Sequence, residues 1–203
     1  MKRKSVGFLC SLMAATLFYA GGAFGADDIR FSTEGNPRAN GLVFSVTFPA
    51  GYEVVEAPPN GSQVVVAYTN EPEFPTVMAL AVAPVPVTDP PFSFNDFKDG
   101  DVTRWVTQSF TPPGGETPRV LSKGKTSHQG HYAIKGDALV NQELLGETQP
   151  SIEQLLFIQY QNSTITAVCS TFNSQRNPNI LLHFHGRGGF DPCNKFFNGI
   201  NLP

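Results

Sequence analysis

Short apolar runs separated by turn residues follow one another from residue 42 onward, and the first of them alternates between apolar and polar side chains with a period of two. Every second side chain from Leu42 to Phe48 is apolar, and a turn at 49–51 ends the run. This alternation is typical of a strand that buries one face. Pro84 and Pro86 place the far end of the last strand in this half at a sheet edge or outside the ladder. The further strands expected here are 52–55, 63–69 and 77–87.

The period changes between 93 and 110. Ser93 followed by Asp96 resembles a capping box with aspartate in place of glutamate. Gly100 weakens the middle of the segment by about 1 kcal/mol relative to alanine. We therefore expect one helix, or two halves divided at Gly100, that covers one face of the sheet. The side chains that recur at near-helical spacing are Phe94, Phe97, Trp105 and Val106.

Strands return after a turn at 111–115. Residues 119–127 and 130–140 are expected to pair around a turn at 128–130, and a loop at 141–150 leads to a strand at 153–161. Residues 155–158 are apolar on both faces, as in a central strand that is covered on both sides. A tight reversal at 162–163 precedes a strand at 164–171.

The last predicted element is a helix that begins at Asp191 and Pro192. Its apolar stripe consists of Cys193, Phe196, Phe197 and Ile200. The order of strands, helix, strands and helix predicts an α+β fold, a single-domain α/β/α sandwich. We expect a mainly antiparallel sheet of about 6–7 strands, with one helix after the first strands and one at the C-terminus.

A basic and then apolar leader precedes these elements. Lys2, Arg3 and Lys4 are followed by an apolar stretch and by Ala23-x-Gly25, which is the layout of a secretory signal peptide. The apolar stretch is too short for a membrane span, so no stable membrane insertion is expected after cleavage. The chain then divides into a signal peptide (1–25), a flexible arm (26–40) and the sandwich domain (41–203). The expected location is the periplasm or the outside of the cell.

The net charge of the chain and the catalytic motifs that it lacks exclude several classes of function. Without the leader, 11 basic residues stand against 17 acidic ones, a net charge of −6. Nucleic acids and anionic membranes bind clustered positive charge and are therefore not expected as partners. The sequence contains no G-x-S-x-G, H-E-x-x-H or C-x-x-C motif. The motifs on which common hydrolases, zincins and thiol-redox proteins depend are therefore missing. A non-enzymatic protein is expected.

Two cysteines remain after the leader, Cys169 and Cys193. In an exported chain an even number of cysteines indicates a disulfide. Closing a loop of about 25 residues would remove roughly 3.5 kcal/mol of unfolded-state freedom. The alternative is a free Cys193 nucleophile assisted by His183 or His185.

The four histidines form two close pairs, His128 with His131 and His183 with His185. On an extended segment His183 and His185 point to one face, where imidazoles suit zinc or copper. The two pairs together would form a metal site, and the alternative is that both lie on polar loops or strand ends.

The segment 173–189 gathers positive character in an acidic chain. It contains Arg176, His183, His185 and Arg187, which could bind an acidic partner or an anionic ligand. The alternative is an exposed insertion without a role.

Three packing motifs stand out: L-V-F-S-V-T-F-P followed by G-Y at 42–52, G-H-Y-A-I-K-G at 130–136, and F-F-x-x-I at 196–200. They resemble the PsbP-like family, which includes photosystem subunits, Ran-binding proteins and exported bacterial proteins. The resemblance implies an α/β/α sandwich across most of the mature chain. It also implies a binding or assembly role in the bacterial cell envelope, with a protein or a small ligand as partner. A metal-binding exported protein is the alternative.

Overall fold

A computed structural model describes residues 27–57, 62–69, 75–111, 117–144, 147–172 and 191–203. Its strands and helices follow the order expected for the sandwich. They are β1 (Ile29–Ser32), η1 (Pro37–Ala39), β2 (Ser45–Phe48), β3 (Glu53–Glu56), β4 (Gln63–Thr69), β5 (Thr76–Pro84), η2 (Phe94–Asp96), α1 (Asp99–Phe110), β6 (Arg119–His128), β7 (His131–Leu144), β8 (Glu147–Tyr160), β9 (Ser163–Phe172), α3 (Asp191–Asn198) and β10 (Ile200–Asn201).

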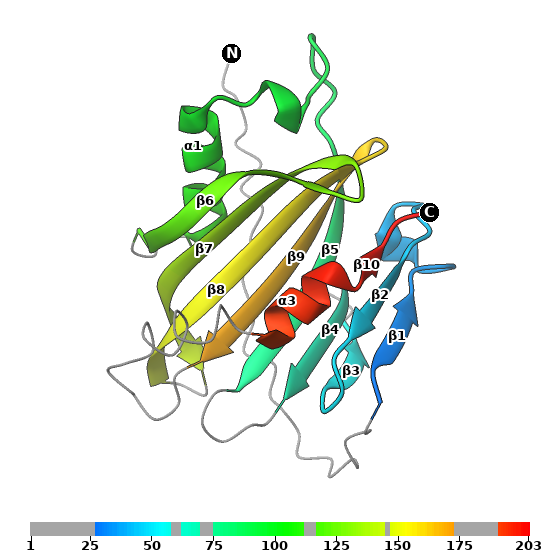
Figure 1. Ribbon diagram of the computed structural model, residues 1–203, viewed down its shortest axis with the longest axis vertical. Coiled ribbons are helices and arrows are strands. Elements are labelled where there is room, and N and C mark those ends of the chain that lie inside the picture. Colours follow the sequence, from blue (N-terminus) through cyan, green and yellow to red (C-terminus); the bar gives the residue numbers. More distant parts are fainter. Residues whose placement is uncertain (1–26, 58–61, 70–74, 112–116, 145–146, 173–190) are drawn as a thin grey trace.

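A seven-stranded sheet forms the centre of the molecule, in the order β3-β4-β5-β9-β8-β7-β6 (Figure 1). Every neighbouring pair in it is antiparallel. All residues of β9 are buried, and so are both faces of β8 between Ser151 and Ile158. The double-sided apolar run at 155–158 is therefore confirmed as part of a central strand.

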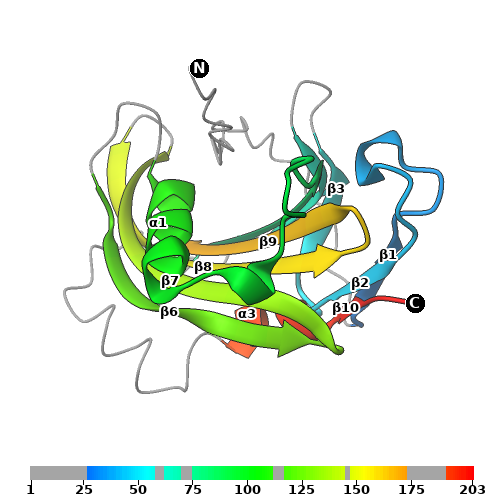
Figure 2. The same ribbon diagram turned by 90° about the horizontal axis from the view of Figure 1, so that it is seen from above.

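One face of this sheet packs against a small sheet and α3. The small sheet has the order β1-β2-β10, and its side chains join those of α3 and of the central strands in one apolar cluster. Phe48 of β2 stacks on Phe196 of α3 with ring centroids 5.3 Å apart. Figure 2 shows α3 on the convex side of the curved sheet.

The other face packs against α1 and η2. Val102, Val106 and Phe110 of α1 are buried in a second apolar cluster with Ile134 of β7 and Phe157 of β8. Figure 2 shows α1 on the concave side, opposite α3. The sheet therefore has a layer on each face, and the expected α+β sandwich is confirmed.

Residues 27–40, which belong to the segment 26–40 expected to be a flexible arm, are instead part of the fold. β1 pairs with β2 from Ile29 to Ser32, and η1 follows it. Ile29 and Phe31 pack against the convex-side cluster. Thr33 donates its hydroxyl proton to the carbonyls of Leu42 and Phe44. Two apolar residues among polar neighbours were too short a pattern to predict this strand.

The expected loop at 141–150 is also replaced by strand. β7 and β8 pair continuously out to Leu144 and Glu147. Asn141 and Thr148 are exposed, so this end of the hairpin projects beyond the core. Backbone pairing needs no apolar side chains, which explains why hydrophobic alternation gave no sign of it.

Both helices end or begin differently from the expectation. The segment 93–110 is divided before Gly100: Ser93 caps η2 by accepting a hydrogen bond from the Asn95 amide, and α1 starts at Asp99. The last helix ends at Asn198, and Ile200 pairs with Val46 in the small sheet instead of continuing the helical stripe. Ile200 reaches the same core from a strand.

Candidate functional site

The first histidine pair flanks the tip of the β6–β7 hairpin. Gln129 and Gly130 both have positive φ, 50° and 84°, as the two central residues of a type I′ turn require. His128 and His131 are therefore directly opposite each other in the register. The H-Q-G-H motif is a two-residue hairpin turn.

The turn holds the strand β10. His128 Nε2 lies 2.8 Å from the carbonyl oxygen of Ile200, and Gln129 Nε2 donates to the same oxygen at 3.0 Å. Gln129 Oε1 accepts from the Leu202 amide at 2.9 Å. Because a carbonyl only accepts, His128 Nε2 carries the proton in this contact and is unavailable to a metal.

His131 also helps to join the hairpin to the C-terminal segment, through the packing of its ring on Tyr160. It packs edge-on against Tyr160 with centroids 4.9 Å apart, and the Tyr160 hydroxyl donates to the Pro203 carbonyl at 3.4 Å. Both histidines of this pair thus join the hairpin to the closing segment. Sequence reasoning found the pair but missed its partner, which is more than 70 positions away from His128.

The zinc or copper site stays a prediction. His183 and His185 lie outside the described residues, as do Arg176 and Arg187 of the proposed binding loop. Within the described ranges there is no group of three or more histidine, cysteine, aspartate and glutamate side chains that could hold a metal ion. Whether the two histidine pairs meet is therefore untested.

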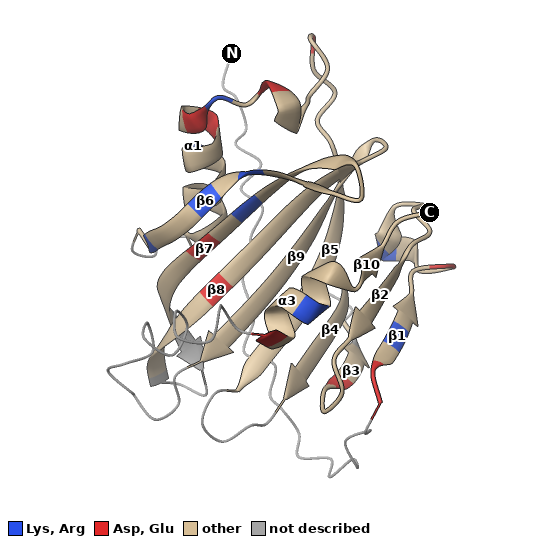
Figure 3. Ribbon diagram, viewed as in Figure 1, with Lys and Arg blue, Asp and Glu red and all other residues tan. Residues whose placement is uncertain are grey.

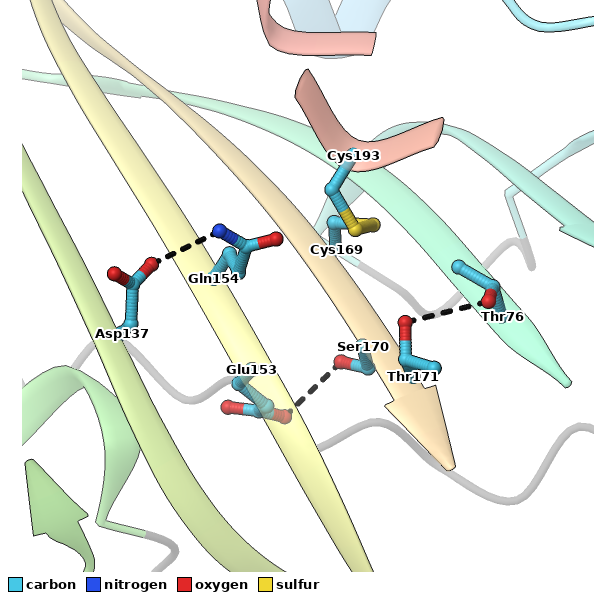
Figure 4. Close-up of a disulfide and its surroundings, with 8 residues drawn as sticks. All are labelled: Thr76, Asp137, Glu153, Gln154, Cys169, Ser170, Thr171 and Cys193. Atoms are coloured by element: carbon cyan, nitrogen blue, oxygen red, sulfur yellow. Dashed lines mark hydrogen bonds between the residues drawn. A yellow bond between two sulfur atoms is a disulfide. The ribbon is translucent and has the colours of Figure 1, made fainter. Parts of the chain in front are cut away.

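The predicted disulfide between Cys169 and Cys193 is present, with an S–S distance of 1.98 Å and Cα atoms 5.7 Å apart. Figure 4 shows it joining β9 to the first turn of α3. Both residues are completely buried. With its sulfur bonded, Cys193 is not the free nucleophile of the alternative interpretation.

A polar row crosses the sheet beside the disulfide. The register places Gln154 of β8 next to Cys169, and Asp137 of β7 next to Gln154. The Gln154 amide donates to Asp137 Oδ1 at 3.1 Å (Figure 4). The Ser122 hydroxyl of β6 donates to Asp137 Oδ2. These bonds satisfy a carboxylate whose residue is only 8% exposed. The row ties the edge of the sheet to its centre.

A second carboxylate lies at the opposite edge. Glu53 of β3 is directly opposite Tyr68 of β4. Burial raises the pKa of Tyr68 above its ordinary 10.0, and the hydrogen bond to the Glu53 carboxylate and its negative charge raise this pKa further. The Tyr68 hydroxyl, which donates to the Glu53 carboxylate, therefore stays protonated to a higher pH than the hydroxyl of a free tyrosine.

The outer edge of β6 is a surface that the sequence did not predict and that the structure shows. Arg119, Lys123 and Lys125 are exposed on this strand, which pairs with β7 alone among the described strands. The available signal was the lack of apolar alternation at 122–127, which is polar apart from Gly124. A strand without an apolar face is typical of a sheet edge.

The comparisons identify the fold. No protein-family model matches the sequence, and no curated protein matches it. Among solved structures, cyanobacterial PsbP (CyanoP) from Synechocystis sp. PCC 6803 superposes with a TM-score of 0.51, 14% identity and coverage of 92% of this chain and 99% of that one. The Ran-binding protein Mog1p of Saccharomyces cerevisiae gives a TM-score of 0.53, 10% identity and coverage of 89% and 96%. The chain has the PsbP/Mog1p-like fold.

A third similar structure is LpqN of Mycobacterium tuberculosis, described as involved in cell envelope biogenesis. Its TM-score is 0.49, with 8% identity and coverage of 87% of this chain and 92% of that one. The CyanoP and Mog1p structures confirm, for the fold, the resemblance noted in the packing motifs. Among the described helices, none is long and apolar enough to cross a membrane.

Proposed function

We propose that this chain is an exported, non-enzymatic binding or assembly protein of the bacterial cell envelope. The disulfide carries the proposal. Cys169 and Cys193 are bonded in the core, and disulfides persist in the periplasm and outside the cell but are rare in the cytosol. The signal peptide predicted at 1–25 agrees with that location.

The binding role is supported by the fold and by the use of the polar side chains. Mog1p, which has the same fold, is described as a Ran-binding protein. In this chain His128 and His131 hold β10, and Asp137 accepts two side-chain hydrogen bonds within the sheet. These groups stabilise the scaffold, so the proposed activity is recognition of a partner by its surface.

Export is tested by expressing the full chain in a bacterium and fractionating the cells. We expect the protein in the periplasm or the medium, with an intact mass that corresponds to a start at or near Ala26. Thiol labelling of the denatured, unreduced protein should find no free cysteine. A full-length chain in the cytosol with three labelled thiols, Cys10, Cys169 and Cys193, would refute the export part of the proposal.

Binding is tested by immobilising the oxidised mature protein and exposing it to solubilised envelope extract from the native host. We expect one or a few proteins or ligands to be retained at low and moderate salt, and none by the heat-denatured protein. Turnover in a broad hydrolase screen that is lost on substitution of a histidine or an aspartate would refute the non-enzymatic part.

A further inference from the structure

β6 is a long open edge of the seven-stranded sheet. It has ten residues, Arg119–His128, and β7 is its only neighbour among the described strands (Figure 1). Apart from Val120, Leu121, Gly124 and His128, its residues are exposed. Such an edge presents a row of backbone donors and acceptors to which another extended chain can add.

The hairpin turn fixes which backbone groups point outward. In a two-residue hairpin the residues that flank the turn, here His128 and His131, form a hydrogen-bonded pair. The pattern then alternates along β6, so Lys123, Lys125 and Ser127 direct their N–H and C=O groups away from β7. No backbone hydrogen bond joins these residues to another described segment outside the ladder.

The same edge is positively charged. Residues 119–136 contain four basic side chains and no acidic one, and Figure 3 shows them along β6 and the adjoining part of β7. Within the described part of the chain, Arg119 and Lys123 have no ion-pair partner. Lys125 donates to the Asn95 carbonyl at 3.1 Å. The mature protein is acidic overall, so this concentration of cations is local.

Two of these basic side chains project from the same face of β6. Lys123 is opposite Gly136 and Lys125 is opposite Ile134, both on the face that carries α1. The two lysines are two positions apart and therefore project to the same side. A strand added to β6 would place every second side chain beside them, where opposite charges are favourable and like charges are not.

We propose that the outer edge of β6 is a docking site for an extended acidic segment of a partner protein, which adds as a further strand with acidic side chains at alternate positions. This inference rests on the proposed binding function and names its surface and partner class. Lysines on the edge also repel basic strands and discourage indiscriminate pairing. A second copy is a poor occupant, because pairing β6 with β6 would bring like charges together, and β3, the other edge of the seven-stranded sheet, is only four residues long.

The test uses three fluorescent ten-residue peptides and measures anisotropy with the oxidised mature protein. The first alternates glutamate with valine or threonine, the second has lysine in place of each glutamate, and the third has the composition of the first with its acids grouped together. We expect the alternating acidic peptide to bind more tightly than the grouped one, and the lysine peptide not to bind.

Two substitutions separate backbone pairing from charge. Lys123→Pro removes an outward N–H without removing a bond to β7, and should weaken acidic-peptide binding by about tenfold or more. Lys123→Ala removes only the side-chain charge and should weaken it by about two- to fivefold. Lys195→Ala is the matched control, because Lys195 is an exposed lysine on α3, and it should leave binding unchanged.

Hydrogen exchange on the unaltered protein is a readout that needs no variant. The acidic peptide should slow exchange at the amides of 123, 125 and 127, and should leave those of β3 unchanged. Equal binding of all three peptides, equal loss in Lys123→Pro and Lys195→Ala, or no protection on β6 would overturn the proposal. A dimer that Lys123→Pro abolishes would also overturn it, in favour of a second copy.

This outcome is separable from that of the proposed function. If the envelope extract yields a partner that Lys123→Pro captures as well as the unaltered protein does, the binding function holds and the β6 site is wrong. If the extract yields no partner while the acidic peptide binds β6, the edge is a docking site and the envelope assignment is wrong.

Discussion

The two layers on the seven-stranded sheet are held in different ways. On the convex side, α3 has only eight residues and is joined to β9 by the disulfide, with Phe196 stacked on Phe48 of the small sheet. On the concave side, α1 has twelve residues and no covalent link to the sheet. It relies on its apolar stripe and on a close approach to Gly136 of β7.

Neither helix is stable by itself, because helix nucleation is costly and isolated helices up to about 12–15 residues long are marginal in water. Each therefore depends on its contacts with the rest of the protein. α1 has a capping contact, in which Asp101 accepts from the Lys98 amide, and buries Val102, Val106 and Phe110. α3 has only eight residues, and its disulfide supplies an anchor at its first turn.

The largest expected effect tests the covalent anchor. Cys169→Ala together with Cys193→Ala should lower the free energy of unfolding by about 2–5 kcal/mol, measured by guanidinium unfolding of the mature protein. Exchange at the amides of α3 should accelerate more than at those of α1. The unaltered protein in excess reductant is the control and should lose a similar amount. An unchanged midpoint in both would show that packing alone holds α3.

The second effect tests the packed anchor. A Cβ added at Gly136 would lie 2.6 Å from Val106 Cγ1, so Gly136→Ala should cost about 1–3 kcal/mol through overpacking. Gly124→Ala on the neighbouring strand is the control, because its Cβ would meet nothing within 4 Å.

A double-mutant cycle sharpens this prediction. Adding Val106→Ala removes the clashing methyl groups, so the double variant should be more stable than the sum of the two single losses predicts. Strict additivity, or a neutral Gly136→Ala, would show that α1 does not depend on this approach. Chemical unfolding of the unaltered protein, the two single variants and the double variant measures the individual losses and the coupling between them.

A smaller effect concerns the contact between the hairpin turn and the convex layer. His128→Leu removes the bond to the Ile200 carbonyl and should cost about 0.5–1.5 kcal/mol, towards the lower end because Gln129 donates to the same oxygen. His128→Gln keeps a side-chain N–H donor and should recover part of the loss in thermal unfolding. Equal losses in the two variants would indicate that ring packing, and not the hydrogen bond, matters here.

The smallest effect depends on pH. The folded-state pKa of Tyr68 is raised above 10.0 by burial and by Glu53, so folding favours the protonated hydroxyl. Its contribution to stability is full below pH 10 and is lost as the pH rises through the folded-state value. Tyr68→Phe should therefore flatten the alkaline limb of the stability profile. Glu53→Gln should lower the Tyr68 pKa in an ultraviolet titration, and an unchanged pKa would contradict the assigned cause.

Local pattern predicted the elements whose side chains alternate or repeat within one segment. The strand at 63–69 has the expected bounds, because its continuous apolar run lies between turn residues on both sides. Ile29 and Phe31 were missed because two apolar residues in a polar segment carry little periodic signal, and their burial depends on pairing with β2. The extension of the β7–β8 hairpin was missed because backbone hydrogen bonds, not side chains, hold it.

The candidate sites divide in the same way. Cys169 and Cys193 were paired from the sequence because an exported chain with two cysteines leaves one pairing. The partners of His128 and His131 were out of reach, because 72 positions separate His128 from Ile200 and only the closing of the small sheet brings them together. The metal and binding-loop hypotheses for 173–189 stay predictions.

The sequence alone predicted the succession of strands, the two helices and the cysteine pairing, since each depends on neighbours in the chain or on simple counting. The leader at 1–25 stays a prediction. Strand order in the sheet needed the folded chain, because it depends on which apolar faces meet across long separations. That order makes β6 an edge and β8 a centre. The cations of β6 therefore acquire a binding role only from their place in the fold, since the same lysines on an interior strand would have no outward backbone beside them.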